Sequence, residues 1–224
     1  MARSEASSGR APVAARYWRL AIAGALVFCY LPVAAQPLQP WVRDCDIQKR
    51  GLAAGRTARL GACVALGWRL HLAGREREAI AVLSEVTRLV PGDEKAFNAL
   101  GVIYLFTGEY AEAAAANRAA LAVRPNGTAH YNLSLALWEL GRFKEAADHA
   151  REAVRFEPDN PHPRVALAIA RWQQGDRNAA LDAYRGAVRL DRRYQRGAYL
   201  DSLAASDFSP RQIRAARTVQ AALR

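Results

Sequence analysis

The feature that most constrains this chain is a pattern that recurs about every 34 residues. The segment LGVIYLFTGEYAEA, which begins at Leu100, recurs as LGWRLHLAGREREA at Leu66, LSLALWELGRFKEA at Leu133 and LAIARWQQGDRNAA at Leu167. These starts lie 34, 33 and 34 residues apart. A fixed period of this length indicates a repeat architecture, in which each unit buries its apolar face against its neighbours.

The residues shared by the copies are those that a helix-turn-helix unit requires. A glycine recurs where a first helix must stop and turn, at Gly74, Gly108, Gly141 and Gly175. Five residues later an alanine recurs, small enough for two helices to approach closely, at Ala79, Ala113, Ala146 and Ala180. Prolines then end three of the second helices, at Pro91, Pro125 and Pro158. Because the apolar positions follow helical spacing rather than strict alternation, the pattern predicts helix pairs and not strands.

Residues 60–194 resemble four tandem tetratricopeptide repeats, which we assign to residues 60–93, 94–126, 127–160 and 161–194. The resemblance implies an all-α fold, a right-handed superhelical α-solenoid whose concave face binds partners. The fourth repeat departs from the pattern, since Arg171 replaces an apolar residue and Arg192 stands where the proline is expected. Terminal repeats tolerate such changes because one of their faces meets solvent or a cap.

Both ends of the chain carry further signals. Arginines precede the uncharged run LAIAGALVFCYLPVAA, which predicts a signal peptide over residues 1–35, cleaved after Ala35, and an exported, periplasmic protein. The alternative is an uncleaved inner-membrane anchor, which would also place the rest of the chain outside the cytoplasm. Residues 36–59 form a lead-in. Residues 195–224 are expected to form capping helices, because Ser209, Pro210 and Gln212 fit the start of a helix with a capping box.

Two cysteines follow the expected cleavage point. In an oxidising compartment Cys45 and Cys63 can form a disulfide, but two buried thiols fit the sequence equally well. The four histidines are scattered singly, without the spacing of a metal site. The sequence therefore predicts no bound metal and no cofactor.

The resemblance also implies a candidate binding groove, because the first helix of each tetratricopeptide pair forms the inner wall. Three positions of that helix, four and three residues apart, fall on one side. The first column is Val64, Asn98, Tyr131 and Val165, the second is Trp68, Val102, Leu135 and Ile169, and the third is His71, Leu105, Trp138 and Trp172. This wall is mainly apolar and aromatic, unlike the Lys, Arg and Asn clamp of chaperone-binding relatives. We expect it to receive a peptide or helix of a partner protein, unless packing between repeats or the chain's own C-terminal helix fills it.

These features favour a non-enzymatic interaction scaffold of the cell envelope. A self-associating assembly protein that uses the same apolar surfaces is the alternative. No nucleophile elbow, paired carboxylates or phosphate loop occurs, which argues against an enzyme. The formal net charge is +11, but only three basic residues are lysines and no basic cluster with interleaved aromatic residues occurs. A nucleic-acid partner is therefore not expected.

Overall fold

The computed structural model describes residues 37–55 and 60–223, and within those ranges the chain contains helices and turns but no strand. The predicted signal peptide lies outside the described residues. No described helix is long and apolar enough to span a membrane. The chain divides into two units, one that extends to Ala79 and one that begins at Ile80, so the helix α3 (Glu76–Leu89) spans the division.

The first unit is built on two helices, α1 (Gln39–Ala53) and α2 (Gly61–Leu72), which pack against each other. The segment that the sequence suggested only as a lead-in thus contains a helix of 15 residues. Pro40 lies in the first turn of α1, where proline is tolerated because its missing N–H would have no helical partner. Trp41 of this helix contacts α2, since the Arg69 guanidinium lies 4.8 Å from the centre of its ring.

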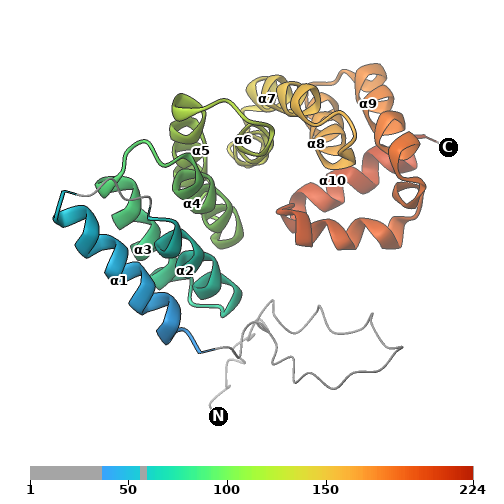
Figure 1. The fold of residues 1–224 in the computed structure, drawn as a ribbon. Coiled ribbons are helices and arrows are strands. Elements are labelled where there is room, and N and C mark those ends of the chain that lie inside the picture. Colours follow the sequence, from blue (N-terminus) through green and yellow to red (C-terminus); the bar gives the residue numbers. More distant parts are fainter. Residues whose placement is uncertain (1–36, 56–59, 224) are drawn as a thin grey trace, which may run out of the picture. The chain divides into compact units, whose positions relative to one another are not determined.

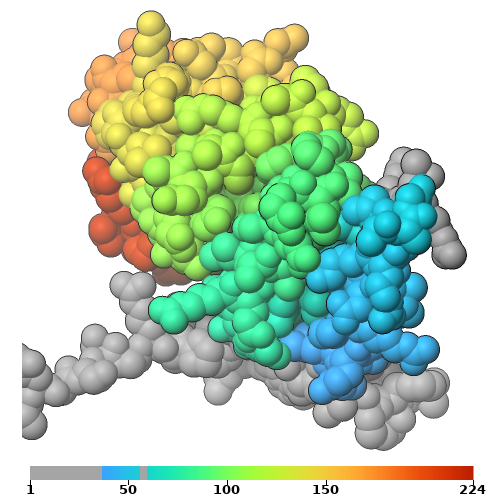
Figure 2. Space-filling view, turned by 90° about the vertical axis from the view of Figure 1, so that its left-hand side faces the viewer, coloured from blue at the N-terminus to red at the C-terminus, as the bar shows by residue number. Residues whose placement is uncertain are grey.

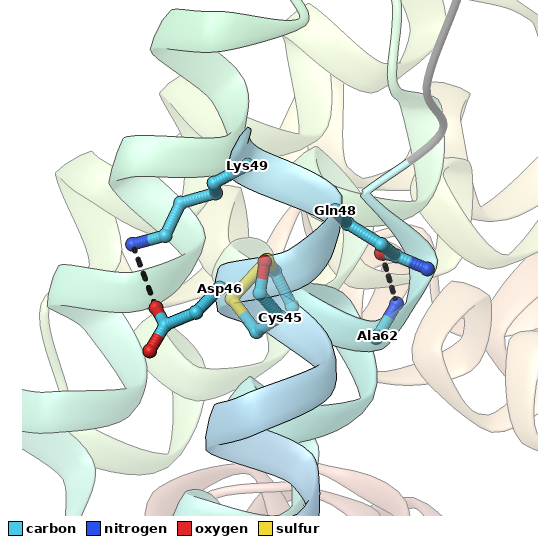
Figure 3. Close-up of a disulfide and its surroundings, with 6 residues drawn as sticks. Cys45, Asp46, Gln48, Lys49 and Ala62 are labelled. Atoms are coloured by element: carbon cyan, nitrogen blue, oxygen red, sulfur yellow. Dashed lines mark hydrogen bonds and ion pairs between the residues drawn. A yellow bond between two sulfur atoms is a disulfide. The ribbon is translucent and has the colours of Figure 1, made fainter. Parts of the chain in front are cut away.

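A disulfide joins the two helices of the first unit (Figure 3). It links Cys45 of α1 to Cys63 of α2, and both residues are buried. Beside it, the Gln48 side chain accepts a hydrogen bond of 2.8 Å from the Ala62 backbone N–H. That N–H belongs to the first turn of α2, where no intrahelical acceptor exists, so α1 provides both a covalent bond and a cap for its neighbour.

The second unit is a stack of antiparallel helix pairs (Figure 1). Each helix packs on the next one along the chain, and the first helices of successive pairs also contact one another. The pairs are α4 (Glu94–Thr107) with α5 (Tyr110–Val123), α6 (Gly127–Glu139) with α7 (Phe143–Phe156), and α8 (Pro161–Gln173) with α9 (Arg177–Leu190). The predicted all-α solenoid of helix-turn-helix repeats is confirmed.

The ends of these helices follow from the recurring residues. The four predicted turn glycines have φ between +73° and +84°, a conformation that costs glycine little because it has no Cβ. Shortly after each proline an Asp or Asn begins the next pair: Asp93, Asn126 and Asn160 each accept a backbone N–H of the following first turn. The proline therefore ends one repeat, and the polar residue after it caps the next.

The helices approach closely because small residues line their contacts. The recurring alanines of the second helices are fully buried, and Gly101 of α4 faces Asn117 of α5. A Cβ at Gly101 would lie 2.2 Å from Asn117 Nδ2, while that amide donates 2.8 Å to the Ala113 carbonyl. The absence of a side chain at Gly101 therefore allows α5 to approach α4 closely at this point.

The chain after α9 continues as two 3₁₀ segments, η3 (Arg192–Gln195) and η4 (Gly197–Ser206), and then as α10 (Pro210–Ala221). Asp207, which has φ 67°, turns the chain between η4 and α10. Ser209 and Gln212 form the capping box that the sequence predicted, with hydrogen bonds of 3.1 and 2.9 Å in opposite directions. We refer to residues 197–221 as the C-terminal segment.

Candidate functional site

The predicted inner wall of the second unit is carried by the first helices, and over α6 and α8 the C-terminal segment covers it. Helix α10 packs against α8 (Figure 1). In the first turn of α10, Gln212 makes a hydrogen bond to α6. In the space-filling view the red atoms of this segment lie directly against the yellow atoms of the preceding helices (Figure 2). Of the alternatives that the sequence left open, filling by the chain's own C-terminal helix is the one observed at these positions.

The first column holds the segment through a tyrosine. Tyr131 of α6 is buried, and its hydroxyl donates a hydrogen bond to the Ser206 carbonyl at the end of η4. Its ring lies 6.0 Å from the ring of Phe208, which is also buried. Burial raises the pKa of Tyr131 well above its ordinary value, and the nearby Asp207 adds to the effect. The phenol therefore remains a protonated donor at neutral pH.

The second column contributes a backbone contact. Gln212 of α10 donates from Nε2 to the Leu135 carbonyl of α6 at 2.8 Å, and its Oε1 accepts the Ser209 N–H. Both Gln212 and Leu135 are almost completely buried. Because the buried amide has partners for both of its ends, the contact adds specificity without an unsatisfied polar group.

The third column is closed by an arginine. Trp138 of α6 is 2% exposed, with the Arg211 guanidinium 5.0 Å from the centre of its ring and Phe143 edge-on at 5.7 Å. Its Nε1 is buried and has no hydrogen-bond partner among the described residues. Trp138 is therefore enclosed by the protein's own side chains.

Glu139 of α6 also contacts the C-terminal segment, and it was not predicted from the sequence. Its side chain is only 5% exposed, yet it accepts 2.5 Å from Ser209 Oγ and lies 3.5 Å from Arg211. A buried carboxylate needs such partners to offset its lost hydration. The sequence signal for Glu139 was its position next to Trp138, a residue of the third column. Only apolar and aromatic residues were selected at that position, so Glu139 was left out.

A histidine of α8 supports the same segment from another side. His162 Nδ1 lies 3.0 Å from Tyr194 Oη, and its Nε2 lies 3.5 Å from Ser206 Oγ. Burial lowers the pKa of His162, while Asp191 and Glu157 act in the opposite direction. A neutral imidazole fits a position between two hydroxyl groups, so His162 has a packing role, as expected for an isolated histidine.

The two groove residues on α8 differ in their surroundings. Ile169 is fully buried, whereas Trp172 is half-buried. The Arg177 guanidinium lies 3.7 Å from the centre of the Trp172 ring and donates 3.1 Å to its carbonyl. Trp138 and Trp172 therefore do not form one exposed aromatic surface.

The groove residues on α4 make contacts within the repeats. Val102 and Leu105 are buried, and Asn98 donates 3.4 Å to Glu94, which also accepts from Asn126. Asn98 Oδ1 is buried without a partner among the described residues. These contacts tie α4 to the loop before α6, and Asn98 is occupied by a structural carboxylate rather than set in a cationic clamp.

The two remaining groove residues belong to the first unit. Trp68 and His71 lie on α2 with their rings 5.9 Å apart, and His71 Nδ1 is 2.7 Å from Glu76 Oε2. Trp68 is half-buried. Of the ten predicted groove residues, two thus lie on α2 in the first unit and eight lie on α4, α6 and α8 in the second.

The chemistry available over α6 and α8 is that of polypeptide recognition. Tyr131 donates a hydrogen bond to a backbone carbonyl, and Glu139 accepts one from a serine hydroxyl and pairs with an arginine. The ring of Phe208 packs beside Tyr131. Among residues 37–55 and 60–223, no group of three or more His, Cys, Asp or Glu side chains could hold a metal ion. The side chains of the wall therefore hold a polypeptide segment of the same chain.

Comparison with known proteins agrees with the repeat architecture. Models of the tetratricopeptide repeat match residues 64–126, 98–161 and 161–185, which together span more than half of the chain. BBSome complex member BBS4 from Bos taurus is 30% identical over 146 residues, 65% of this chain and 27% of that protein. The chain thus spans about a quarter of the length of this curated relative.

Two solved structures are similar in fold. One is described as "YrrB: a TPR protein with an unusual peptide-binding site", with a TM-score of 0.61 at 16% identity, over 83% of this chain and 94% of that one. The other is MamA, with a TM-score of 0.60 at 17% identity, over 70% of this chain and 87% of that one. At these identities the likeness shows the fold alone.

Proposed function

We infer the function from one premise: the chain belongs to the tetratricopeptide repeat family. We propose that the protein is a non-enzymatic interaction scaffold that binds a peptide or helix of a partner protein on the wall formed by α6 and α8. Fold alone does not assign a partner, so the proposal rests on the contacts of this wall.

The observation that carries the proposal is that the wall already holds a polypeptide segment, the chain's own. Tyr131 binds a backbone carbonyl, Glu139 binds a serine and an arginine, and Phe208 is enclosed. The same groups can bind an equivalent segment of another protein when the C-terminal segment is displaced. The preferred partner presents an aromatic residue just before a helix whose first turn carries an arginine.

We further propose that the protein works outside the cytoplasm, in the cell envelope. The disulfide between Cys45 and Cys63 supports this placement, because disulfides form and persist mainly in oxidising compartments. The proposal predicts that the mature protein begins after Ala35. Mass spectrometry of the protein isolated from its host, without reductant, tests the cleavage and the disulfide together.

Competition between the C-terminal segment and a peptide tests the binding wall. A fluorescent peptide with the sequence of residues 197–223 is added to the full chain and to the variant Phe208→Ala. The linked segment competes at an effective concentration that reaches the millimolar range for short linkers. We therefore expect the variant to bind the peptide at least about tenfold more tightly than the parent protein does.

Two further variants make this test specific. Phe156→Ala removes an aromatic ring that is 48% exposed on α7, and it should leave peptide binding at the parental level. Adding Glu139→Lys to Phe208→Ala should abolish binding, since it replaces the buried acceptor by a like charge for Arg211. Equal binding with and without Glu139→Lys would refute the proposed wall. A mass that rises with concentration, together with loss of that rise in Glu139→Lys, would instead favour the self-associating alternative.

A further inference from the structure

A cavity of about 480 Å³ lies at the far end of the second unit, between α9, η3 and α10. It is lined by Arg185, Val188, Arg189, Gln195, Gln220 and Leu223. None of these residues belongs to α6 or α8, and none makes the contacts described for the binding wall. The cavity is therefore a separate place on the molecule, and what it could bind is a separate question.

The cavity carries an excess of positive charge. Arg185 and Arg189 are one helical turn apart and point to the same side of α9. Arg185 is 2.9 Å from Asp182, in an exposed pair that contributes little, whereas Arg189 has no hydrogen bond or ion pair among the described residues. Two more arginines follow closely, Arg192 and Arg196, and the nearby Asp191 is already bound to Arg193 at 2.8 Å. A cationic group without a partner beside a cavity favours an anionic ligand.

The other lining residues restrict the kind of anion. Val188 and Leu223 offer apolar surface, and both are partly buried against the core of the unit. Gln195 is exposed and brings an amide that can both donate and accept. Gln220 is held in place, because its Nε2 donates 3.0 Å to the Tyr194 carbonyl. An apolar floor between arginines and an amide matches a short chain with carboxylates, an aliphatic group and backbone amides.

We propose that this cavity binds an acidic peptide segment that inserts one aliphatic side chain. The aliphatic group packs on Val188 and Leu223, carboxylates on either side pair with Arg189 and Arg185, and Gln195 bonds to the peptide backbone. Among the described residues, no aromatic ring lines the cavity on which a nucleic-acid base could stack, and a flat membrane surface cannot fill the cavity. The cavity is distinct from the α6 and α8 wall, but Gln220 lies on the C-terminal segment and Leu223 directly follows it, so the cavity is complete only while that segment is in place.

Fluorescence polarisation on the full chain tests the proposal. The probe is a labelled pentapeptide with one central leucine flanked by two glutamates on each side, and the comparison peptide has serine in place of leucine. We expect the leucine peptide to bind at least about fivefold more tightly, because burying a leucine side chain is worth more than that ratio requires. Arg189→Glu should weaken binding at least about tenfold, through both a lost attraction and a new repulsion.

Three controls identify the site. Arg189→Gln should give an intermediate loss, and Leu223→Ser should remove the preference for leucine while leaving the serine peptide unaffected. Lys144→Glu, the same change of charge at an exposed position of α7, should retain near-parental affinity. The thermal transition of each variant should stay close to that of the parent, since the substituted side chains are exposed or partly exposed.

Several outcomes would overturn the proposal. Absence of binding, unchanged affinity in Arg189→Glu, or equal affinity for the leucine and serine peptides would each do so. So would binding of single-stranded DNA or of anionic phospholipid vesicles that is as tight as that of the peptide and is lost equally in Arg189→Glu, because the arginines would then attract any polyanion. Arg189→Glu does not alter the binding wall, which Phe208→Ala and Glu139→Lys test separately, so failure of one proposal can be distinguished from failure of the other.

Discussion

The two ends of the described chain are attached to their neighbours in opposite ways. At the N-terminal end, α1 is fixed to α2 by a covalent bond, and Cys45 is the one buried residue of this fully described helix. Of its large apolar residues, Val42 and Ile47 are 43% and 48% exposed, whereas Trp41 and Leu52 are partly buried. At the C-terminal end no disulfide fixes the segment within the described residues, but burial is extensive. Leu200, Leu203, Phe208, Ile213 and Val219 are all at most 8% exposed.

This difference indicates that the two ends respond to different conditions. A helix with one buried residue gains little from apolar packing, so its attachment depends on the oxidation state of two sulfurs. A segment held by many buried contacts resists reduction, but it can open as a unit and be replaced by a similar segment. The disulfide is suited to keeping α1 attached permanently. The buried contacts are suited to holding a C-terminal segment that can be exchanged for another.

Loss of the Phe208 ring should have the largest effect on this comparison. Phe208→Ala removes a side chain that is 3% exposed and contacts Tyr131, and such changes in a core cost about 3–5 kcal/mol. We expect faster amide hydrogen exchange throughout α10 and unchanged exchange in α1. Phe156→Ala is the matched control, because that ring is 48% exposed. Unchanged protection of α10 would show that the contacts with α6 do not hold the segment.

Reduction of the disulfide should have the next largest effect, at the other end. The disulfide links residues 18 apart in sequence. By the chain-entropy estimate, closing a loop of this size stabilises the folded state by about 3 kcal/mol. Reductant should therefore increase hydrogen exchange in α1 and leave α10 unaffected. Cys45→Ser should show the same exchange in α1 with and without reductant. If α1 keeps its protection when reduced, packing and the Gln48 contact hold it, and the contrast between the ends is weaker than we infer.

The sequence predicted the repeating part of the fold because its determinants are local. A turn glycine, a buried alanine and a terminating proline each act within a few residues, so the period exposes them. Helix α1 was not predicted, because Pro40 suggested an irregular segment, although proline is favourable in the first turn of a helix.

The candidate site was harder to predict because it depends on the path of the chain. The three columns place the predicted wall on the first helices, but the segment that covers α6 and α8 comes from about 70 residues away. The hydrogen bond from Gln212 to the Leu135 carbonyl joins residues that are 77 positions apart in sequence. The hydrogen bond from Ser209 to Glu139 joins residues that are 70 positions apart. A capping box predicts where α10 begins and does not indicate which surface it meets. Long-range polar contacts of this kind have no local pattern.

Acidification should loosen the C-terminal end selectively, with a smaller effect than Phe208→Ala or reduction of the disulfide. Burial holds the folded pKa of His162 below its ordinary value, so the unfolded chain binds the proton more readily. The contribution of this residue is therefore complete above about pH 6.5, the unfolded pKa, and decreases as pH falls toward the folded pKa. Urea unfolding at pH 7.5 and 5.5 measures the loss.

The variant His162→Gln isolates this contribution from those of His130 and His149, whose pKa values are also lowered by burial. The difference in unfolding free energy between the two pH values should be smaller in His162→Gln than in the parent protein. An identical difference would remove His162 as the source. Hydrogen exchange in α1, corrected for intrinsic rates, should not follow this trend, since the disulfide does not titrate.

The smallest effect is expected for an ion pair that links the two parts of the C-terminal segment. Arg217 of α10 lies 2.6 Å from Asp201 of η4, but the side chains are 45% and 67% exposed. Exposed pairs contribute about 0–1 kcal/mol, because water and salt screen the attraction and two flexible side chains must be ordered. Arg217→Ala should therefore lower the unfolding free energy by less than about 1 kcal/mol. The double variant with Asp201→Ala should yield a coupling energy within the same range. A larger coupling that disappears in high salt would mean that surface charge, and not the buried contacts of Phe208, Gln212 and Glu139, keeps the segment closed.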